Sequence, residues 1–263
     1  METHVKNMNW RFKRQLIIFL VALGAFILAS VLLFDFRGEA NCFDGRKNGN
    51  ETGVDCGGSC LLACAALSKP LLVRFARPFE AAPGVFNAVA YVENPNPRQA
   101  IFQISYEFRL YDSRDVLIAE RIGKTFVPPN GRIVVFETDI RTFEREPIRA
   151  VFRFLEDPQW IQVDPNIVNL PISINDEAIS SPNSTPRLSA LLRNESIYVL
   201  RDISVAAILY DEFGNAVAAS KTLLENIPRK ENVPILFSWN KPFAAPPVRI
   251  EIIPEIDVFD LRL

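Results

Sequence analysis

The chain has 263 residues, of which 49% are hydrophobic and 23% are charged, and its formal net charge is −2. A near-neutral chain without a basic stripe is unlike a nucleic-acid-binding protein, so we expect no nucleic-acid partner. Its single histidine, His4, precedes the hydrophobic segment described next, so the chain after that segment lacks the base of a Ser-His-Asp or Cys-His catalytic group.

An uncharged hydrophobic segment, LIIFLVALGAFILASVLLF, occupies residues 16–34 after a basic tail, residues 1–15. It lacks the polar positions at a period near 3.6 that mark a half-buried helix. As a helix it would be about 30 Å long, enough to cross the hydrocarbon core of a bilayer. Because Lys and Arg precede the segment, we predict a single-pass anchor in the cell membrane, with a cytoplasmic N-terminus and extracytoplasmic C-terminal domains. A cleaved signal peptide is the alternative hypothesis.

All four cysteines lie in residues 42–64, CFDGRKNGNETGVDCGGSCLLAC. They are Cys42, Cys56, Cys60 and Cys64. Structural zinc sites usually have two C-x2–4-C pairs separated along the chain, and here the first cysteine stands alone. Thiols outside the cytoplasm are oxidised, so we predict a disulfide-rich loop segment. Three pairings are possible, and the spacing does not choose among them.

Acidic and amide residues inside this segment support two hypotheses. The residues are Asp44, Asn48, Asn50, Glu51 and Asp55. Their oxygens are of the kind that calcium binds, although the EF-hand pattern is absent. The same side chains can instead hold backbone amides in Asx-turns without a metal. We predict structural turns, with calcium as the alternative and with no other cofactor.

The composition changes after Ser68, where short apolar runs alternate with Pro, Gly, Asn and Asp. This pattern predicts an all-β fold of antiparallel sheets. In IFQISYEFRLYD, strict alternation would place Phe102, Ile104, Tyr106, Phe108 and Leu110 on one buried face. The stretch SINDEAISSPNSTPR, residues 173–187, is predicted to be a loop because it is rich in Ser, Asn and Pro.

The first half of this region recurs in the second half at an offset near one hundred residues. Asn94 corresponds to Asn194, Tyr111-Asp112 to Tyr210-Asp211, and Val135-Phe136 to Leu236-Phe237. One hundred residues is the usual size of a β-sandwich. We therefore predict two tandem sandwiches, residues 70–163 and residues 165–263.

Each repeat contains a predicted hairpin turn after its Tyr-Asp pair. Asp112 and Asp211 can accept hydrogen bonds from the amides that follow them. Gly214 suits the left-handed position that closes the second turn, and Asp115 occupies the same position in the first. A catalytic or metal-binding role for Asp112 and Asp211 is the alternative, but the same Asp recurs where the same turn is needed.

Two stretches resemble known families. Phe108-Arg109-Leu110-Tyr111-Asp112 spells the F-x-L-Y-D signature, so the first repeat resembles the FxLYD domain of bacterial and archaeal envelope proteins. Its V-x-N-P-N is also similar to the water-stress (WHy) domains of late-embryogenesis proteins, while the second repeat has Ala207 in place of the signature Phe. Cys42 to Cys60 resembles a Cys-rich element of surface proteins, C-x-D-G-x-x-N-x-x-E-x-x-x-D-C-G-G-x-C. These resemblances imply two immunoglobulin-like sandwiches in an extracellular protein with no established chemistry.

The sequence therefore predicts a membrane-anchored binding or scaffolding protein rather than an enzyme. Its two sandwiches would face a protein or cell-envelope partner through loops or by strand addition at a sheet edge. The alternative is a surface carbohydrate-active hydrolase, or an accessory subunit, that uses carboxylates in a cleft between the sandwiches. Two carboxylates about 5 to 10 Å apart in one pocket would favour the hydrolase.

Overall fold

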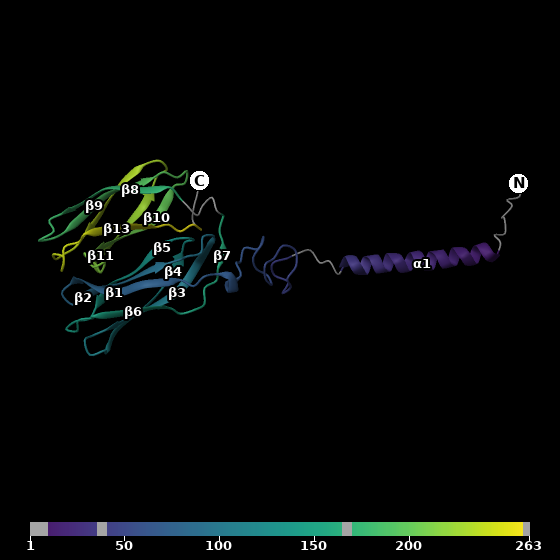
Figure 1. Ribbon diagram of the computed structural model, residues 1–263, viewed down its shortest axis with the longest axis horizontal. Coiled ribbons are helices and arrows are strands. Elements are labelled where there is room, and N and C mark those ends of the chain that lie inside the picture. Colours follow the sequence, from purple (N-terminus) through teal and green to yellow (C-terminus); the bar gives the residue numbers. More distant parts are fainter. Residues whose placement is uncertain (1–9, 36–40, 165–169, 260–263) are drawn as a thin grey trace. The chain divides into compact units, whose positions relative to one another are not determined.

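The computed structural model describes residues 10–35, 41–164 and 170–259 (Figure 1). The chain divides into two compact units, residues 1–58 and residues 59–263. Residues 1–9 of the predicted cytoplasmic tail and residues 165–169 at the start of the predicted second sandwich lie outside the described residues. The predicted class, all-β after one N-terminal apolar helix, is confirmed.

Helix α1 (Trp10–Asp35) contains the predicted membrane segment. Over Trp10–Val31 its mean hydropathy is 2.2, and none of this window is buried. Among the described residues it is the one helix that is long and apolar enough to cross a membrane. A water-exposed apolar surface of this length is unfavourable, so the helix needs an apolar environment to cover it.

The first sandwich packs two antiparallel sheets face to face, after a short 3-10 helix η1 (Ala65–Leu67). Its strands are β1 (Leu72–Ala82), β2 (Val85–Glu93), β3 (Gln99–Tyr111), β4 (Leu117–Val127), β5 (Arg132–Arg141), β6 (Arg149–Phe154) and β7 (Ile161–Gln162). One sheet has the order β1-β2-β5, and the other has the order β4-β3-β6 with β7 paired to β3. Buried side chains such as Ala90, Phe108 and Val135 form the core between them.

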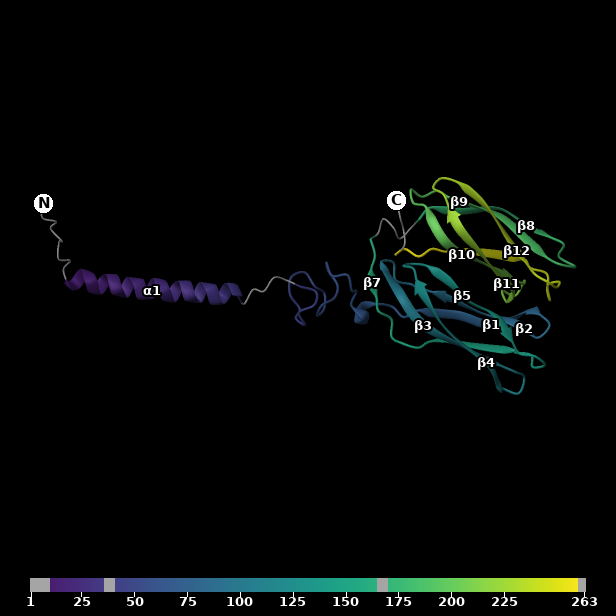
Figure 2. The ribbon, with the colours of Figure 1, turned by 180° about the vertical axis from the view of Figure 1, so that it is seen from behind.

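The second sandwich repeats this arrangement, except that β7 has no counterpart among the described residues. Its strands are β8 (Ile172–Ser180), β9 (Arg187–Asn194), β10 (Leu200–Tyr210), β11 (Ala216–Ile227), β12 (Asn232–Ser238) and β13 (Arg249–Glu255). The sheets have the orders β12-β9-β8 and β11-β10-β13, with a core of their own that includes Leu192, Leu209 and Phe237. Figures 1 and 2 show the four sheets of the two sandwiches as successive layers.

Three details differ from the sequence-based expectation, and each has a local cause. A bulge between Ile101 and Ile104 interrupts the alternation of β3, so Ile101 is fully buried and Phe102 is 58% exposed. Residues 172–180 form strand β8 instead of a loop, with a bulge between Asn175 and Ala178 that accommodates Asp176 at φ 57°. In the sheet register, Val135 corresponds to Ile235 rather than to Leu236, because Ala90 pairs with Val135 and Ala190 with Ile235.

Gly123 in β4 leaves room for the side chain of Tyr106 in β3 to reach Glu137 in the opposite sheet of the first sandwich. The hydroxyl of the buried Tyr106 donates a hydrogen bond to Glu137 Oε1 at 2.7 Å. A Cβ at Gly123 would overlap the Tyr106 hydroxyl and would lie 2.5 Å from its ring carbon Cζ and 2.8 Å from Glu137 Oε1. The absence of a side chain at residue 123 is therefore what leaves room for this bond.

We expect Gly123→Ala to lower the free energy of unfolding by about 1–3 kcal/mol, the usual cost of overpacking a core. Thermal unfolding of the full chain measures this loss. Tyr106→Leu is the control, because it removes both the hydroxyl and the ring carbon Cζ and so makes room for the new methyl group. The double variant should therefore lose less than the sum of the single variants, and simple additivity would contradict the proposed clash.

Candidate functional site at the interface of the two sandwiches

All four cysteines are disulfide-bonded, which confirms the predicted disulfides. Cys60 and Cys64, at the start of the second unit, are buried with 3% and 9% exposure. Disulfides reduce the conformational freedom of the unfolded chain, and a segment this short has little core of its own.

The five candidate calcium ligands lie in tight turns. Asp55, at φ 53°, accepts the amides of Asp44 and Gly45 at 3.0 and 2.9 Å. Glu51 Oε2 accepts the amides of Asn48 and Asp55 at 3.2 and 3.3 Å.

Asp44 and Asn50 belong to the same turns. The carboxylate of Asp44 accepts the amide of Arg46 at 2.8 Å and the side-chain amide of Asn48 at 2.5 Å. The carbonyl of Asn50 lies against Gly58, where a Cβ would overlap it. These are the bonds that the turn hypothesis requires. Calcium binding by the same residues stays a prediction.

The Asp residues of the two hairpins hold the turns between strands. Asp112 Oδ1 accepts the amides of Arg114 and Val116 at 2.9 and 3.0 Å, and Asp211 Oδ1 accepts those of Phe213 and Asn215 at 3.0 and 2.7 Å. The hydrogen bond from the Val116 amide lowers the pKa of Asp112 against the opposing effect of burial, and the Arg114 amide and the charges of Arg114 and Arg145 lower it further. Asp115 and Gly214 have φ of 61° and 78°, so both close their turns from the left-handed region.

In each sandwich an arginine lies over the ring of the tyrosine in the Tyr-Asp pair, a contact that the sequence analysis did not predict. The guanidinium of Arg149 lies 4.3 Å from the ring centre of Tyr111, and that of Arg249 lies 3.6 Å from the ring centre of Tyr210. These are cation–π contacts, and both sandwiches contain one. The two arginines are one hundred positions apart, so the repeat itself could have revealed them.

The outer face of sheet β1-β2-β5 packs against the outer face of sheet β11-β10-β13, and we call this contact the sandwich interface. Its buried apolar side chains are Val89, Tyr91, Val134, Ala206, Ile208, Tyr210, Ala216, Ala219 and Ile253. Strands β2 and β10 are consequently buried on both faces. Strands of this kind have nearly continuous apolar sequences, as in FNAVAYV and ISVAAILY.

The sequence determines which face of each sandwich docks. Strands β3 and β10 are equivalent, but the outward positions held by Glu107 and Arg109 in β3 are held by Ala206 and Ile208 in β10. Glu107 binds Arg109 at 3.0 Å and Arg153 at 2.5 Å, which makes this face of the first sandwich a charged surface. A charged face cannot pack as its apolar counterpart does without a large desolvation cost.

The sheet on the other side of the interface, β1-β2-β5, also differs from its equivalent in the second sandwich, β8-β9-β12. Val89 and Tyr91 of β2 lie in the sandwich interface, whereas the equivalent Ser189 and Leu191 of β9 face outward, flanked by exposed Arg187. The interface therefore joins two non-equivalent faces, as in a head-to-tail contact.

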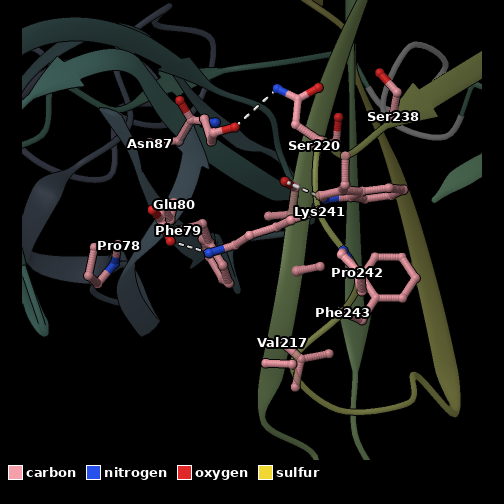
Figure 3. A pocket seen from close by; sticks show the side chains of 16 residues that line it. Pro78, Phe79, Glu80, Asn87, Val217, Ser220, Ser238, Lys241, Pro242 and Phe243 are labelled. Atoms are coloured by element: carbon pink, nitrogen blue, oxygen red, sulfur yellow. Dashed lines mark hydrogen bonds and ion pairs between the residues drawn. The ribbon is translucent and has the colours of Figure 1, made fainter. Parts of the chain in front are cut away.

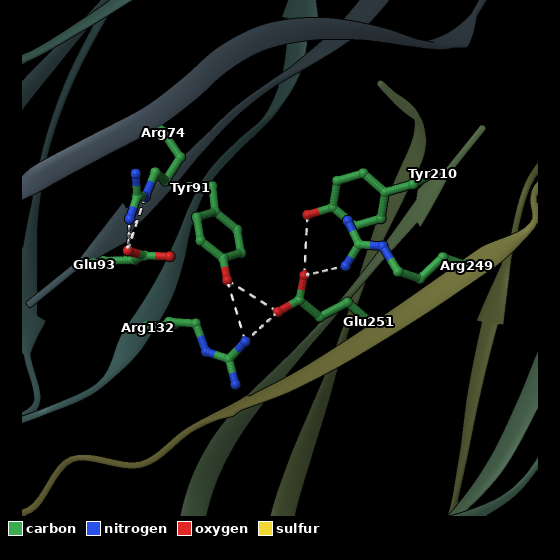
Figure 4. A network of polar contacts seen from close by, with 7 residues as sticks. All are labelled: Arg74, Tyr91, Glu93, Arg132, Tyr210, Arg249 and Glu251. Carbon is green, nitrogen blue, oxygen red and sulfur yellow. Dashed lines mark hydrogen bonds and ion pairs between the residues drawn. The ribbon is translucent and has the colours of Figure 1, made fainter. Parts of the chain in front are cut away.

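Glu251 joins the two sandwiches at the edge of the apolar contact (Figure 4). Its Oε1 lies 2.5 Å from Arg132 Nη1 and accepts the Tyr91 hydroxyl at 2.9 Å, both from the first sandwich. Its Oε2 accepts the Tyr210 hydroxyl at 3.1 Å and lies 3.3 Å from Arg249. Burial raises the pKa of Tyr91 to about 12, and the bond to Glu251 adds to the rise, so Tyr91 stays a proton donor.

Glu255 is a buried carboxylate at the same interface. Its Oε1 accepts the amide of Val134, in the edge strand β5 of the first sandwich, at 2.6 Å. Lys221 Nζ lies 3.8 Å from the other oxygen. Burial raises the pKa of Glu255, against the opposing effects of Lys221 and the Val134 amide.

We expect Glu255→Gln to raise the melting temperature of the full chain at neutral pH. The folded protein holds the Glu255 proton more tightly than the unfolded chain, so stability falls as pH rises above the ordinary value of 4.5. Glutamine avoids this loss and can still accept the Val134 amide, so the gain should vanish towards pH 4. Glu251→Gln is the control and should lower the melting temperature, since it weakens two Arg pairs. A lower melting temperature for Glu255→Gln at neutral pH would show that Lys221 outweighs burial.

A groove lies at one end of the sandwich interface, and Figure 3 shows its side chains. It is lined by residues 78–81 and Asn87 of the first sandwich and by residues 217–220 and 238–244 of the second, with a volume of about 410 Å³. Lys241 pairs with Glu80 across it, and Asn240 Nδ2 donates to Ala81 O at 3.0 Å. We call this hollow the interface groove.

The hydrolase hypothesis requires two carboxylates in one pocket, so we located the carboxylates that line the interface groove and a second hollow. Glu80 is the one carboxylate among the residues that line the interface groove, and it pairs with Lys241. Glu156 and Asp157 line a second hollow of about 360 Å³ beside β3. There the Ser105 amide donates to Glu156 at 2.7 Å and lowers the pKa of Glu156. A general acid needs a raised pKa, and the pKa of Glu156 is shifted the other way. The hydrolase alternative stays a prediction.

Comparison with known protein families finds no family model that matches the chain, and no curated protein is similar to it. Among solved structures, the crystal structure of red sea bream transglutaminase is similar over 72% of this chain and 29% of that chain. The sequence identity is 12% and the TM-score is 0.22. The chain thus spans less than a third of that protein, and a similarity this low supports no conclusion about activity.

Proposed function

We propose that the chain is a single-pass membrane protein that holds two docked β-sandwiches outside the cytoplasm as a binding or scaffolding unit, without enzymatic activity. The observation that carries the proposal is the succession of an exposed apolar helix α1 and four disulfide-bonded cysteines. Disulfides persist in oxidising compartments, and the basic residues before the helix favour a cytoplasmic N-terminus. Both features support the same topology.

The edges of the sheets limit how a partner could bind. Pro78 lies in β1, Pro234 in β12 and Pro254 in β13, while β8 contains the bulge at Asp176. Proline and bulges at edge strands block pairing with a further strand. These four edges are therefore poor sites for strand addition, whereas the edge strands β4, β5, β6 and β11 contain no proline. We propose that a partner binds loops or the interface groove.

The resemblance to FxLYD and WHy domains remains part of this proposal, together with an immunoglobulin-like class for both sandwiches. The resemblance is supported by the positions that the F-x-L-Y-D residues occupy in the first sandwich. Phe108 and Leu110 are fully buried in the core, Tyr111 lies under Arg149, and Asp112 holds the turn. Each residue of the motif thus has a structural task, which fits a domain signature without catalytic chemistry.

Trapping of thiols in intact cells tests the proposed compartment. Alkylation followed by mass spectrometry of the full chain should modify none of the four cysteines until a reductant is added. The sample should be quenched with acid first, so that disulfides cannot form during lysis. Alkylation of two or more cysteines without reductant would contradict an oxidising compartment and would require another role for the segment.

A further inference from the structure

The interface groove has a lining that selects for uncharged ligands. Its one cation and its one carboxylate, Lys241 and Glu80, are paired with each other. The remaining polar side chains are two amides and two hydroxyls: Asn87, Ser220, Ser238 and Asn240. Amides and hydroxyls both donate and accept hydrogen bonds, so they match ligands whose own groups do the same.

The backbone around the groove is already hydrogen-bonded, which disfavours an extended peptide. Strands β1 and β11 form its walls and are edge strands. Asn240 donates to Ala81 O at 3.0 Å, and the indole of Trp239 donates to Ala219 O at 3.1 Å. Arg77 donates to Ala216 O at 3.2 Å, just beyond the groove. A peptide that bound by strand pairing would compete with these bonds.

Aromatic rings provide the apolar part of the lining. Phe79 comes from the first sandwich, and Trp239 and Phe243 come from the second, packed edge to face with ring centres 5.2 Å apart. All three are partly exposed. The electron-rich face of an aromatic ring attracts the weakly positive C–H groups of a sugar ring. A volume of about 410 Å³ is within the usual range for small-ligand sites.

We propose that the interface groove binds a neutral carbohydrate, with the sugar ring against Phe79, Trp239 and Phe243 and its hydroxyls bonded to Asn87 and Ser238. This inference rests on the proposed binding role and adds the class of ligand. Since the walls belong to both sandwiches, bound sugar also stabilises the docked pair.

Calorimetry of the full chain with neutral oligosaccharides tests the proposal. The probes are neutral hexasaccharides of the maltose, cellulose, xylan, mannan and chitin series. The hexasaccharide of polygalacturonate is the negatively charged counterpart. A polyoxyethylene detergent keeps α1 soluble without adding sugar. At least one neutral hexamer is expected to bind at millimolar concentration or below, and the charged hexamer is expected to bind more weakly.

Asn87→Ala combined with Ser238→Ala should weaken that binding about tenfold, the effect of losing two ordinary hydrogen bonds. Asn226→Ala combined with Ser180→Ala removes the same groups outside the groove and should leave binding unchanged. Absence of binding by every neutral hexamer would overturn the proposal, as would equal binding by the two double variants. Either result leaves the topology of the chain unaffected, because thiol trapping in cells measures it independently.

Discussion

Replacing Ala206 by Glu and Ile208 by Arg is expected to separate the two sandwiches while each keeps its own core. Both residues are fully buried in the sandwich interface, and the new side chains are those that the first sandwich has at the equivalent positions. Burying two charges in an apolar contact costs several kcal/mol, so we expect a loss of more than about 4 kcal/mol in docking free energy. Wild-type unfolding should be a single transition, and this variant should show two transitions and a larger radius in X-ray scattering.

The reciprocal exchange is the matched control. Glu107→Ala with Arg109→Ile changes the same two positions of the first sandwich, where the face is free. It should leave the docked pair intact and should promote self-association through the new apolar face. If Ala206→Glu with Ile208→Arg kept a single transition and an unchanged radius, the apolar contact would not be what joins the sandwiches.

Asn194→Ala is expected to destabilise the second sandwich strongly although Asn194 is polar. Its side chain is fully buried, and Nδ2 donates to the carbonyls of Tyr198, Ile227 and Pro228 at 2.8, 3.1 and 3.2 Å. Its Oδ1 accepts the amide of Ser196 at 3.0 Å. Alanine leaves these groups buried and unpaired, and we expect a loss of about 2–4 kcal/mol in denaturant unfolding.

The corresponding residue in the first sandwich extends this prediction. Asn94 Nδ2 donates to the carbonyls of Gln99 and Pro128 at 2.7 and 2.8 Å, so Asn94→Ala should have a similar effect. Asn183→Ala removes an exposed asparagine in the turn after β8 and serves as the control. A loss below about 0.5 kcal/mol for Asn194→Ala, the range of ordinary surface substitutions, would contradict the role given to the buried amide.

Local patterns predicted the strands, the repeat and the turn residues, because these depend on short-range chemistry. Alternation identified the core positions Ile104 to Leu110 of β3 correctly and failed only at Phe102, where a bulge reverses the faces. Polar composition was misleading for residues 173–180, because β8 is an edge strand whose outward side chains are exposed. Composition distinguishes buried from exposed positions, but an exposed edge strand has much the same composition as a loop.

The sandwich interface was not predicted, although the sequence contains a signal for it. The comparison of Glu107 and Arg109 with Ala206 and Ile208 shows that one copy of the face is apolar. A single strand with apolar residues on both faces identifies such a contact but not its partner. The partner groups, such as Arg132 for Glu251 and Val134 for Glu255, lie more than a hundred residues away and depend on the packing of whole sheets.

Protease treatment of intact cells that express the full chain, with one epitope tag at each terminus, measures directly on which side of the membrane the sandwiches lie. We predict that added protease removes the C-terminal tag from intact cells and leaves the N-terminal tag protected until the membrane is permeabilised. A C-terminal tag that survives in intact cells and is lost only after permeabilisation would contradict the extracytoplasmic placement of the sandwiches.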